Sequence, residues 1–175
     1  MDTKKRIVET ALKIYTSKPP HEVTIEEVAR EAGVSKSLVL YYFKNKDNLE
    51  KEVANYTFKQ LMEEWRGKIN STKDLIDLMV ENFKELPNFV RFWVYISGKL
   101  LYHGEYEFFR GLFDEFVDVV VPIFERERIS NPKKSAIALM ALFDGLGLYS
   151  LFYDLNIEEY RKIAIEFVEC RRLKK

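Results

Sequence analysis

Cysteine and histidine are scarce in this 175-residue sequence, which contains one cysteine, Cys170, and two histidines, His21 and His103. A lone cysteine excludes an internal disulfide bond, which fits a reducing compartment. The two histidines lie far from each other and from Cys170, so the sequence contains no Cys/His cluster with the spacing of a metal site. We therefore expect no metal and no other cofactor.

Motifs of catalysis are also missing. The sequence has no Gly-x-Ser-x-Gly elbow, and "SGK" at 97–99 lacks the upstream glycine and the strand of a phosphate-binding loop. The adjacent acids Glu26–Glu27 and Glu63–Glu64 point in different directions on a helix, as is typical of solvated faces. The sequence predicts a protein that is not an enzyme.

A secretory signal and an uninterrupted apolar span are both lacking. The longest apolar stretch, 135–153, is nearly long enough to cross a bilayer. Asp144 lies at its midpoint, where an unpaired carboxylate is costly, so a buried helix is favoured over a membrane span. Without a signal peptide, the chain is predicted to be cytoplasmic and to have no membrane partner.

Net charge is absent, because 28 basic side chains balance 28 acidic ones. An anionic partner would therefore be met by a local patch and not by the whole surface. Lys36, Lys44 and Lys46 supply the basic excess in a short stretch of the N-terminal part. This concentration is the first candidate for such a patch.

Proline and glycine are few, at five and seven residues, and strand-like alternation is not seen. The apolar residues recur at helical spacing, which predicts an all-α protein of about nine helices. Thr24 with Glu27, and Asp47 with Glu50, have capping-box spacing at two helix starts. The expected helices cover about 3–17, 24–32, 35–43, a long segment from 47 to the mid-60s, 72–85, 88–102, 105–127 (with a kink at Pro122), 132–153 and 158–173. They are predicted to form a three-helix head at residues 1–46 and a helical body at 47–175.

Two short helices joined at Gly33 suggest a helix-turn-helix. Ala29 is small where the helices must cross, and Gly33 lies where the turn needs a positive φ. Val39 is expected to point into the core with Ile25 and Val28. A structural hairpin with solvated lysines is the alternative, and the agreement of all these spacings favours DNA binding.

This register predicts which side chains face a DNA major groove. Lys36 can approach phosphates or guanine acceptors, and Leu40 can contact a thymine methyl group. Aromatic hydroxyls and a second lysine are expected to contact phosphates, as is the start of the second helix. The complete predicted DNA-binding set is Thr24, Ser35, Lys36, Ser37, Leu40, Tyr41, Tyr42 and Lys46.

The stretch "TIEEVAREAGVSKSLVLYYFKNKDNL" resembles the DNA-binding head of the tetracycline-repressor (TetR) family of transcriptional regulators. The resemblance covers residues 1 to about 50. The family commonly has a tyrosine where this chain has Leu40, which moves the expected phosphate contact to Tyr41 and Tyr42. The resemblance implies a helical body that holds an effector pocket and forms a homodimer.

Aromatic residues are concentrated between residues 83 and 124, where they either fill a core or line a cavity. The resemblance implies an effector with apolar surface in this body. Asp144 is a candidate partner for a cationic ligand, with satisfaction by a neighbouring hydroxyl or arginine as the alternative. The predicted pocket set is Trp65, Phe89, Trp93, Ile96, Phe113, Asp144 and Tyr149.

Small and apolar residues recur at spacings of three and four near the C-terminus. The resemblance implies that the last two helices pair with their symmetry mates, and packing within one chain is the alternative. The predicted dimer set is Ala138, Ala141, Gly145, Tyr160, Ile163, Ala164 and Phe167. The resulting hypothesis is a ligand-responsive transcriptional regulator that binds a near-palindromic operator as a homodimer. Repression is favoured over activation. The alternative is a helical small-molecule-binding or enzymatic protein with an incidental helix-turn-helix.

Overall fold

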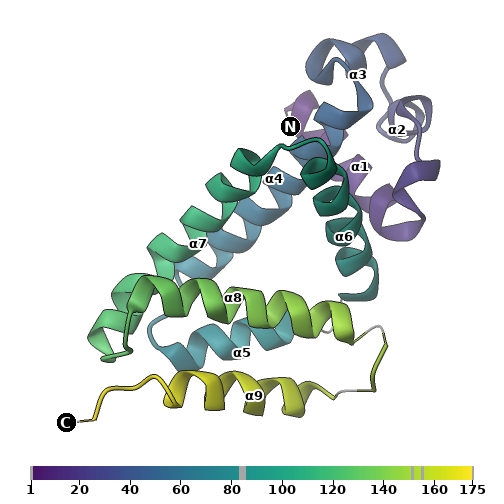
Figure 1. The fold of residues 1–175 in the computed structure, drawn as a ribbon. Helices are drawn as coiled ribbons and strands as arrows, with labels where there is room; N and C mark the ends of the chain where they lie inside the picture. The colour runs from purple at the N-terminus through teal and green to yellow at the C-terminus, as the bar shows by residue number, and fades with distance from the viewer. Residues whose placement is uncertain (1, 83–85, 151, 155, 175) are drawn as a thin grey trace. The chain divides into compact units, whose positions relative to one another are not determined.

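A computed structural model of the chain describes residues 2–82, 86–150, 152–154 and 156–174, with residues 82 and 86–89 described in their backbone alone. Nine α-helices and one short 3₁₀ helix, η1, make up the secondary structure of these residues (Figure 1), which confirms the predicted all-α class. The helices are α1 (Thr3–Ser17), α2 (Ile25–Glu31), α3 (Lys36–Phe43), α4 (Lys46–Arg66), α5 (Thr72–Asn82), α6 (Leu86–Tyr102), α7 (Tyr106–Arg126), α8 (Pro132–Tyr149) and α9 (Ile157–Glu169); η1 covers Pro20–Glu22.

The start of α4 differs from the prediction, because Asp47 and Glu50 do not cap it. The side-chain oxygen of Asn45 accepts a hydrogen bond from the backbone N–H of Asn48 at 2.9 Å, so Asn45 caps the helix. The carboxylates of Asp47 and Glu50 both accept hydrogen bonds from Lys99, on a helix far away in the sequence. A local pattern suggested the wrong partner for these two acids.

The end of α8 also differs, because the helix stops at Tyr149 and not at residue 153. The backbone N–H groups of Phe152 and Tyr153 both donate to the carbonyl of Tyr149, at 2.9 Å each. The hydroxyl of Ser150 donates to the carbonyl of Gly147 at 2.7 Å. These bonds close the last turn, so the apolar sequence that follows lies outside the helix.

The chain divides into two compact units. Unit 1 contains Met1–Gln60 and Pro87–Glu105, and unit 2 contains Leu61–Leu86 and Tyr106–Lys175. Helix α4 therefore starts in unit 1 and ends in unit 2. The predicted division at residues 46 and 47 concerns roles in binding, and it stays a prediction.

Unit 1 consists of a three-helix head packed with α6 and the first part of α4 (Figure 1). The head core is formed by apolar side chains of all three helices: Ile7, Val8, Ala11, Val28, Val39 and Phe43. Helix α6 joins α1 through the stacked rings of Tyr15 and Phe92, whose centroids lie 5.3 Å apart. It also contacts α4 through Phe58 and Trp93, edge to face at 6.4 Å. These contacts hold the head on a helical support.

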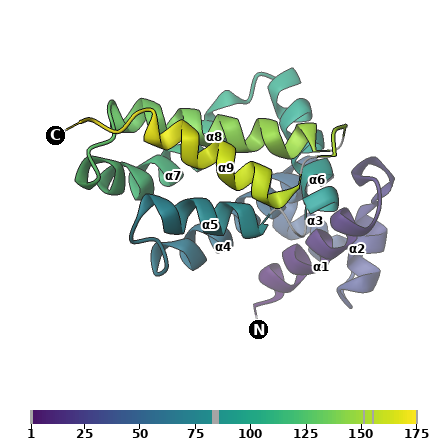
Figure 2. The same cartoon turned by 90° about the horizontal axis from the view of Figure 1, so that it is seen from below.

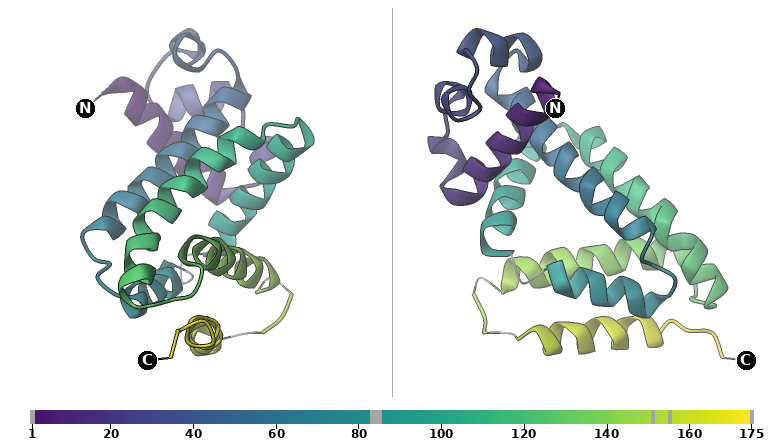
Figure 3. Two further views of the ribbon diagram at one scale, coloured as in Figure 1. Left: turned by 60° about the vertical axis from the view of Figure 1, so that its left-hand side comes forward. Right: turned by 180° about the vertical axis from the view of Figure 1, so that it is seen from behind.

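Unit 2 is built from pairwise helix contacts: α7 packs on α8, α8 on α9, and α9 on α5. Figure 2 shows α5, α8 and α9 side by side, and Figure 3 shows α8 and α9 running antiparallel. The hydroxyl of Tyr160 on α9 donates to the carbonyl of Leu146 on α8 at 3.0 Å. Among the described residues, no helix combines the length and the apolar character that crossing a bilayer requires.

Candidate nucleic-acid interface

The turn between α2 and α3 is fixed by Gly33, whose φ of +63° is in the left-handed region that favours glycine. The N–H of Val34 donates to the carbonyl of Ala29 at 2.9 Å, and the N–H of Gly33 to that of Arg30 at 3.1 Å. This pair of bonds is the Schellman pattern that ends a helix. The predicted positive φ at Gly33 is confirmed, and a Cβ there would meet open space. The backbone conformation therefore accounts for the glycine.

The starts of both helices are capped by hydroxyl groups. Thr24 Oγ1 accepts from the N–H of Glu27, and Ser35 Oγ accepts from the N–H of Leu38, each at 3.2 Å. The hydroxyl half of the box predicted at Thr24 is confirmed, and Ser35 caps α3 in the same way. The carboxylate of Glu27 accepts from Lys18 Nζ at 2.5 Å. The Ser35 cap sets where α3 begins and therefore which residues this helix exposes.

The outward face of α3 contains most of the predicted DNA-binding residues. Val39 is fully buried, as expected, so the residues opposite it face solvent. Tyr41 is 79% exposed and is the most exposed large hydrophobic side chain of the head, while Tyr42 is 36% exposed. Ser35, Lys36 and Ser37 are exposed and Leu40 is half-buried. Ile25, expected in the core with Val39, is also half-buried.

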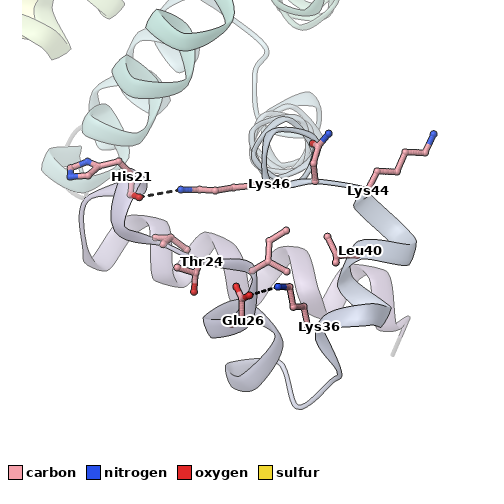
Figure 4. Close-up of a pocket in the computed structure, with 10 residues that line it drawn as sticks. His21, Thr24, Glu26, Lys36, Leu40, Lys44 and Lys46 are labelled. Carbon is pink, nitrogen blue, oxygen red and sulfur yellow. Dashed lines mark hydrogen bonds and ion pairs between the residues drawn. The ribbon is translucent and has the colours of Figure 1, made fainter.

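An open groove of about 550 Å³ lies beside this face, and residues of α2 and α3 form part of its lining (Figure 4). Thr24 and Glu26 line it from α2, and Lys36 and Leu40 line it from α3. Figure 4 shows Lys36 and Glu26 pointing toward each other, in agreement with the hydrogen bond from Lys36 Nζ to Glu26 Oε1. That hydrogen bond lowers the pKa of the Glu26 carboxyl group, so the acid is ionised at neutral pH.

The two lysines after α3 differ in their surroundings. Lys46 Nζ donates to the carbonyl of Pro20 at 2.8 Å and lies 3.6 Å from Glu50 Oε1. This amine is occupied in tying α4 to η1, so it is not presented for a phosphate. Lys44 is exposed, has a φ of +66° and extends outward in Figure 4. Sequence reasoning noted Lys44 in the basic cluster but did not place it among the binding residues.

A buried polar cluster supports unit 1 on the α6 side, and sequence reasoning missed it. Glu50 on α4 is fully buried, and it accepts hydrogen bonds from Lys99 Nζ at 2.6 Å and from the Tyr95 hydroxyl at 3.2 Å. Desolvation lowers the pKa of Lys99, but its bonds to Asp47 and Glu50 outweigh that effect and raise the pKa above its usual value. Burial and the nearby Glu50 carboxylate raise the pKa of Tyr95. The cluster gives the Lys99 ammonium group two carboxylate acceptors and so ties α6 to α4 inside the unit.

The predicted pocket residues are distributed over both units. In unit 1, Ile96 is buried and Trp93 contacts Phe58; the side chain of Phe89 lies outside the described residues. In unit 2, Trp65 contacts Phe116 edge to face at 6.3 Å, and Phe113 stacks on Phe109 at 5.9 Å.

Asp144 and Tyr149, the remaining pocket residues, lie on α8 in unit 2. Asp144 retains contact with solvent, although surrounding protein atoms partly desolvate its carboxyl group and raise its pKa to about 6. Tyr149 is exposed and, with Tyr153, borders an apolar groove of about 400 Å³ along α8. The floor of this groove is formed by Ala141, Leu142, Gly145 and Leu146.

Two residues of the predicted dimer set are buried within unit 2, which corrects their assignment. Tyr160 is 3% exposed and donates to the carbonyl of Leu146 on α8, and Ala164 is fully buried on a helix that packs against α8 and α5 of its own chain. Of the others, Ala141 is exposed and the rest are half-buried: Ala138, Gly145, Ile163 and Phe167. The period of α9 was predicted correctly, but two residues of the stripe fill the core and not a partner surface.

No group of three or more His, Cys, Asp or Glu side chains in the described ranges is placed to hold a metal ion. The site is instead a capped helix-turn-helix that presents hydroxyls, a tyrosine ring and lysines to solvent. These groups suit the phosphates and base edges of a DNA major groove. Fold and surface together define a helix-turn-helix DNA-binding protein.

Comparison with known proteins gives a family match for the N-terminal part of the chain. Residues 7–53 match the model described as "Bacterial regulatory proteins, tetR family". The HTH-type transcriptional regulator BetI of Serratia proteamaculans is 22% identical over 93% of this chain and 87% of its own length. The regulator YuxN of Bacillus subtilis is 28% identical over 61% of this chain, and the match spans only 38% of YuxN.

Solved structures share the fold over nearly the whole chain. A TetR transcription regulator from Haloarcula marismortui gives a TM-score of 0.81 at 17% identity, covering 97% of this chain and 98% of its own. A transcriptional regulator from Saccharomonospora viridis, solved in complex with choline, gives 0.72 at 18% identity and covers 98% of both chains. NalD, the secondary repressor of the MexAB-OprM multidrug efflux pump in Pseudomonas aeruginosa, gives 0.60 at 21% identity over 95% of this chain and 96% of its own. Residues 7–53 thus match the TetR family of bacterial regulatory proteins, and the present chain shares the fold of TetR regulators over nearly its whole length.

Proposed function

We propose that this regulator represses transcription by binding a near-palindromic operator as a homodimer, and that a small molecule bound in the helical body releases it. The observation that carries the proposal is the exposed face of α3, where Ser35, Lys36 and Tyr41 stand clear of the core. NalD, a structural neighbour, is a repressor. The proposal places the protein in the cytoplasm and gives it no catalytic role.

The assigned contacts follow the surroundings of each side chain. Ser35, Lys36, Ser37 and Leu40 read base edges, because they line or border the first turns of α3. Tyr41, Tyr42 and the start of α2 at Thr24 hold phosphates. Lys44 takes the phosphate contact that the sequence assigned to Lys46, since the Lys46 amine is already bound to η1.

A single short helix reads too few base pairs to select one operator, which is why the proposal requires two heads. A two-fold dimer presents both heads to half-sites separated by about one helical turn, which is roughly 34–36 Å. Small residues on α8 support close approach of a second copy there: Ala141 is exposed, and Ala138 and Gly145 on either side of it are half-buried. The dimer surface proposed is the exposed side of α8 and α9, without Tyr160 and Ala164.

The effector proposed has apolar surface and at least one polar group. The aromatic side chains of the body supply apolar surface, and the buried indole N–H of Trp65 meets no hydrogen-bond acceptor among the described residues. Such a donor would be satisfied by an acceptor on the ligand. Helix α4 would carry the signal, because it starts in unit 1 and ends in unit 2. The ligand must favour one state energetically to change operator affinity.

The experiment compares Lys44→Gln with Lys59→Gln by gel shift at several salt concentrations. Lys59 is exposed on α4, about 20 Å along the helix axis from its start. We expect Lys44→Gln to weaken binding to all duplexes alike and to reduce the salt slope by about 0.9, the value for one lost phosphate contact. Lys59→Gln should behave as the wild type. If the wild-type chain selects no duplex from a random pool, the proposed operator binding is wrong.

A further inference from the structure

The Glu26–Lys36 pair stands out because it places a carboxylate in the middle of a surface proposed to meet a polyanion. Lys36 Nζ donates to Glu26 Oε1, and the two side chains are 53% and 60% exposed. Both line the groove between α2 and α3, together with Leu40. A solvent-exposed pair of this kind contributes little to stability. Its position in the groove therefore calls for a role other than holding the fold.

The carboxylate restricts what Lys36 can bind. An unpaired lysine is a flexible point charge that binds a nearby phosphate, and such contacts carry no sequence information. Glu26 is ionised at neutral pH and repels a phosphate that approaches Lys36. The favourable site for both groups is one that offers an acceptor to the ammonium group and a donor to the carboxylate side by side.

One edge of a base pair meets this requirement. In the major groove, guanine presents the acceptors N7 and O6, and its partner cytosine presents the N4 amino group as a donor next to them. Lysine binds the guanine acceptors and glutamate accepts from cytosine N4. An A·T pair also places a donor, adenine N6, beside acceptors, but N7 and thymine O4 are single acceptors on either side of it. Guanine instead offers two adjacent acceptors to the ammonium group, so the G·C pair is favoured.

We propose that Glu26 and Lys36 act as one unit that reads a G·C base pair in each operator half-site, with Glu26 holding Lys36 on the base edge and away from the phosphates. Glu26 is thus a specificity-determining residue on α2, outside the recognition helix. This inference rests on the proposed operator binding, since it assigns one base position within that operator.

The test is a selection of duplexes from a random pool by the full-length wild type, Glu26→Gln and Lys36→Met. Glu31→Gln is the matched control: Glu31 lies on the same helix, is exposed and pairs with its neighbour Arg30, but does not line the groove. We expect the wild type to select G·C at one position per half-site, and Glu26→Gln and Lys36→Met to lose the preference at that same position. The expected loss of discrimination is about tenfold, the lower part of the range for one base contact.

Binding to an unrelated duplex of equal length supplies a second measurement. Glu26→Gln frees Lys36 for a phosphate, so affinity for that duplex should rise and the salt slope should increase by about 0.9. Glu31→Gln should leave both quantities unchanged. Circular dichroism melting curves of all variants would verify that the exposed substitutions leave the fold intact.

The outcomes separate the inference from the function on which it rests. If the wild type selects a motif and Glu26→Gln retains every preference, as Glu31→Gln does, the base-reading pair is wrong and operator binding stands. Preferences lost at different positions in Glu26→Gln and Lys36→Met would also overturn the pair. If the wild type selects no motif, both the inference and the proposed function are lost.

Discussion

Two of the lysine–carboxylate sites in unit 1 differ sharply in solvent exposure. Glu26 and Lys36 connect α2 and α3 at the surface, with more than half of each side chain in water. Glu50 and Lys99 connect α4 and α6 inside, with exposed fractions of 0% and 22%. Water weakens the first attraction and leaves the partners free to exchange for DNA, whereas burial makes the second one costly to break. The same pair of chemical groups is thus proposed to serve recognition in one place, and it supports the packing of two helices in the other.

The largest effect is expected from breaking the buried site with Glu50→Ala. Removal of the carboxylate leaves the Lys99 ammonium group without its buried partner and takes an acceptor from Tyr95. We expect the free energy of unfolding, measured with urea, to fall by about 3–5 kcal/mol. Asp47→Ala removes the exposed partner of the same lysine and should cost less than about 1 kcal/mol. Equal losses of unfolding free energy in the two variants would show that burial does not determine how much each carboxylate stabilises the protein.

The second prediction concerns the turn that brings Glu26 and Lys36 together. Gly33→Ala places a side chain on a backbone with φ of +63°, which should destabilise the protein by about 1–2 kcal/mol. Gly98 offers the opposite case, because it is exposed within α6 and a Cβ there meets open space. Gly98→Ala should stabilise the helix by about 0.5–1 kcal/mol. Urea unfolding of both variants measures the contrast, and a stabilising Gly33→Ala would contradict the account of the turn.

These two regions also differ in how far the sequence predicted them. The exposed face of α3 could be predicted from local signals, because Gly33 ends α2, Ser35 caps α3 and Val39 marks the face that is buried. Each signal acts within a few residues, so the pattern was sufficient for the helix bounds and the exposed residues. The pairing of Glu26 with Lys36 was missed, because two exposed charges ten residues apart carry no periodic signature.

The buried site was not predicted, for a physical reason that Glu50 illustrates. Its partner Lys99 lies 49 residues away in the sequence, and only the packing of α6 against α4 brings the two together. Local spacing instead assigned Glu50 to a capping box with Asp47, and it assigned Lys46 to a phosphate. The same limit applies to α9, where the apolar stripe was correct but Tyr160 and Ala164 proved to face the protein's own core.

The smallest effect is expected from Asp47, which is the exposed partner of Lys99. The dependence of this effect on pH can be measured. The hydrogen bond from Lys99 lowers the pKa of Asp47 below its usual value of 3.8. A folded-state pKa below the unfolded value means that the stabilisation is fully present above pH 3.8 and is lost as the pH falls through the folded value. At pH 7, Asp47→Asn should therefore cost a few tenths of a kcal/mol, about the lower end for exposed pairs, because 58% of the Asp47 side chain is in water.

Urea titrations of the wild type and Asp47→Asn at a series of pH values test this expectation. The difference in unfolding free energy between them should be constant at neutral pH and shrink to zero in acid, since a protonated aspartic acid resembles asparagine in charge. The Glu50→Ala deficit has a different origin, namely the half-buried Lys99 ammonium group left without its fully buried partner. If the Asp47→Asn difference persisted in acid, its cause would be the shape or packing of the side chain, and the division between an exposed electrostatic partner and a buried structural one would not apply to Lys99.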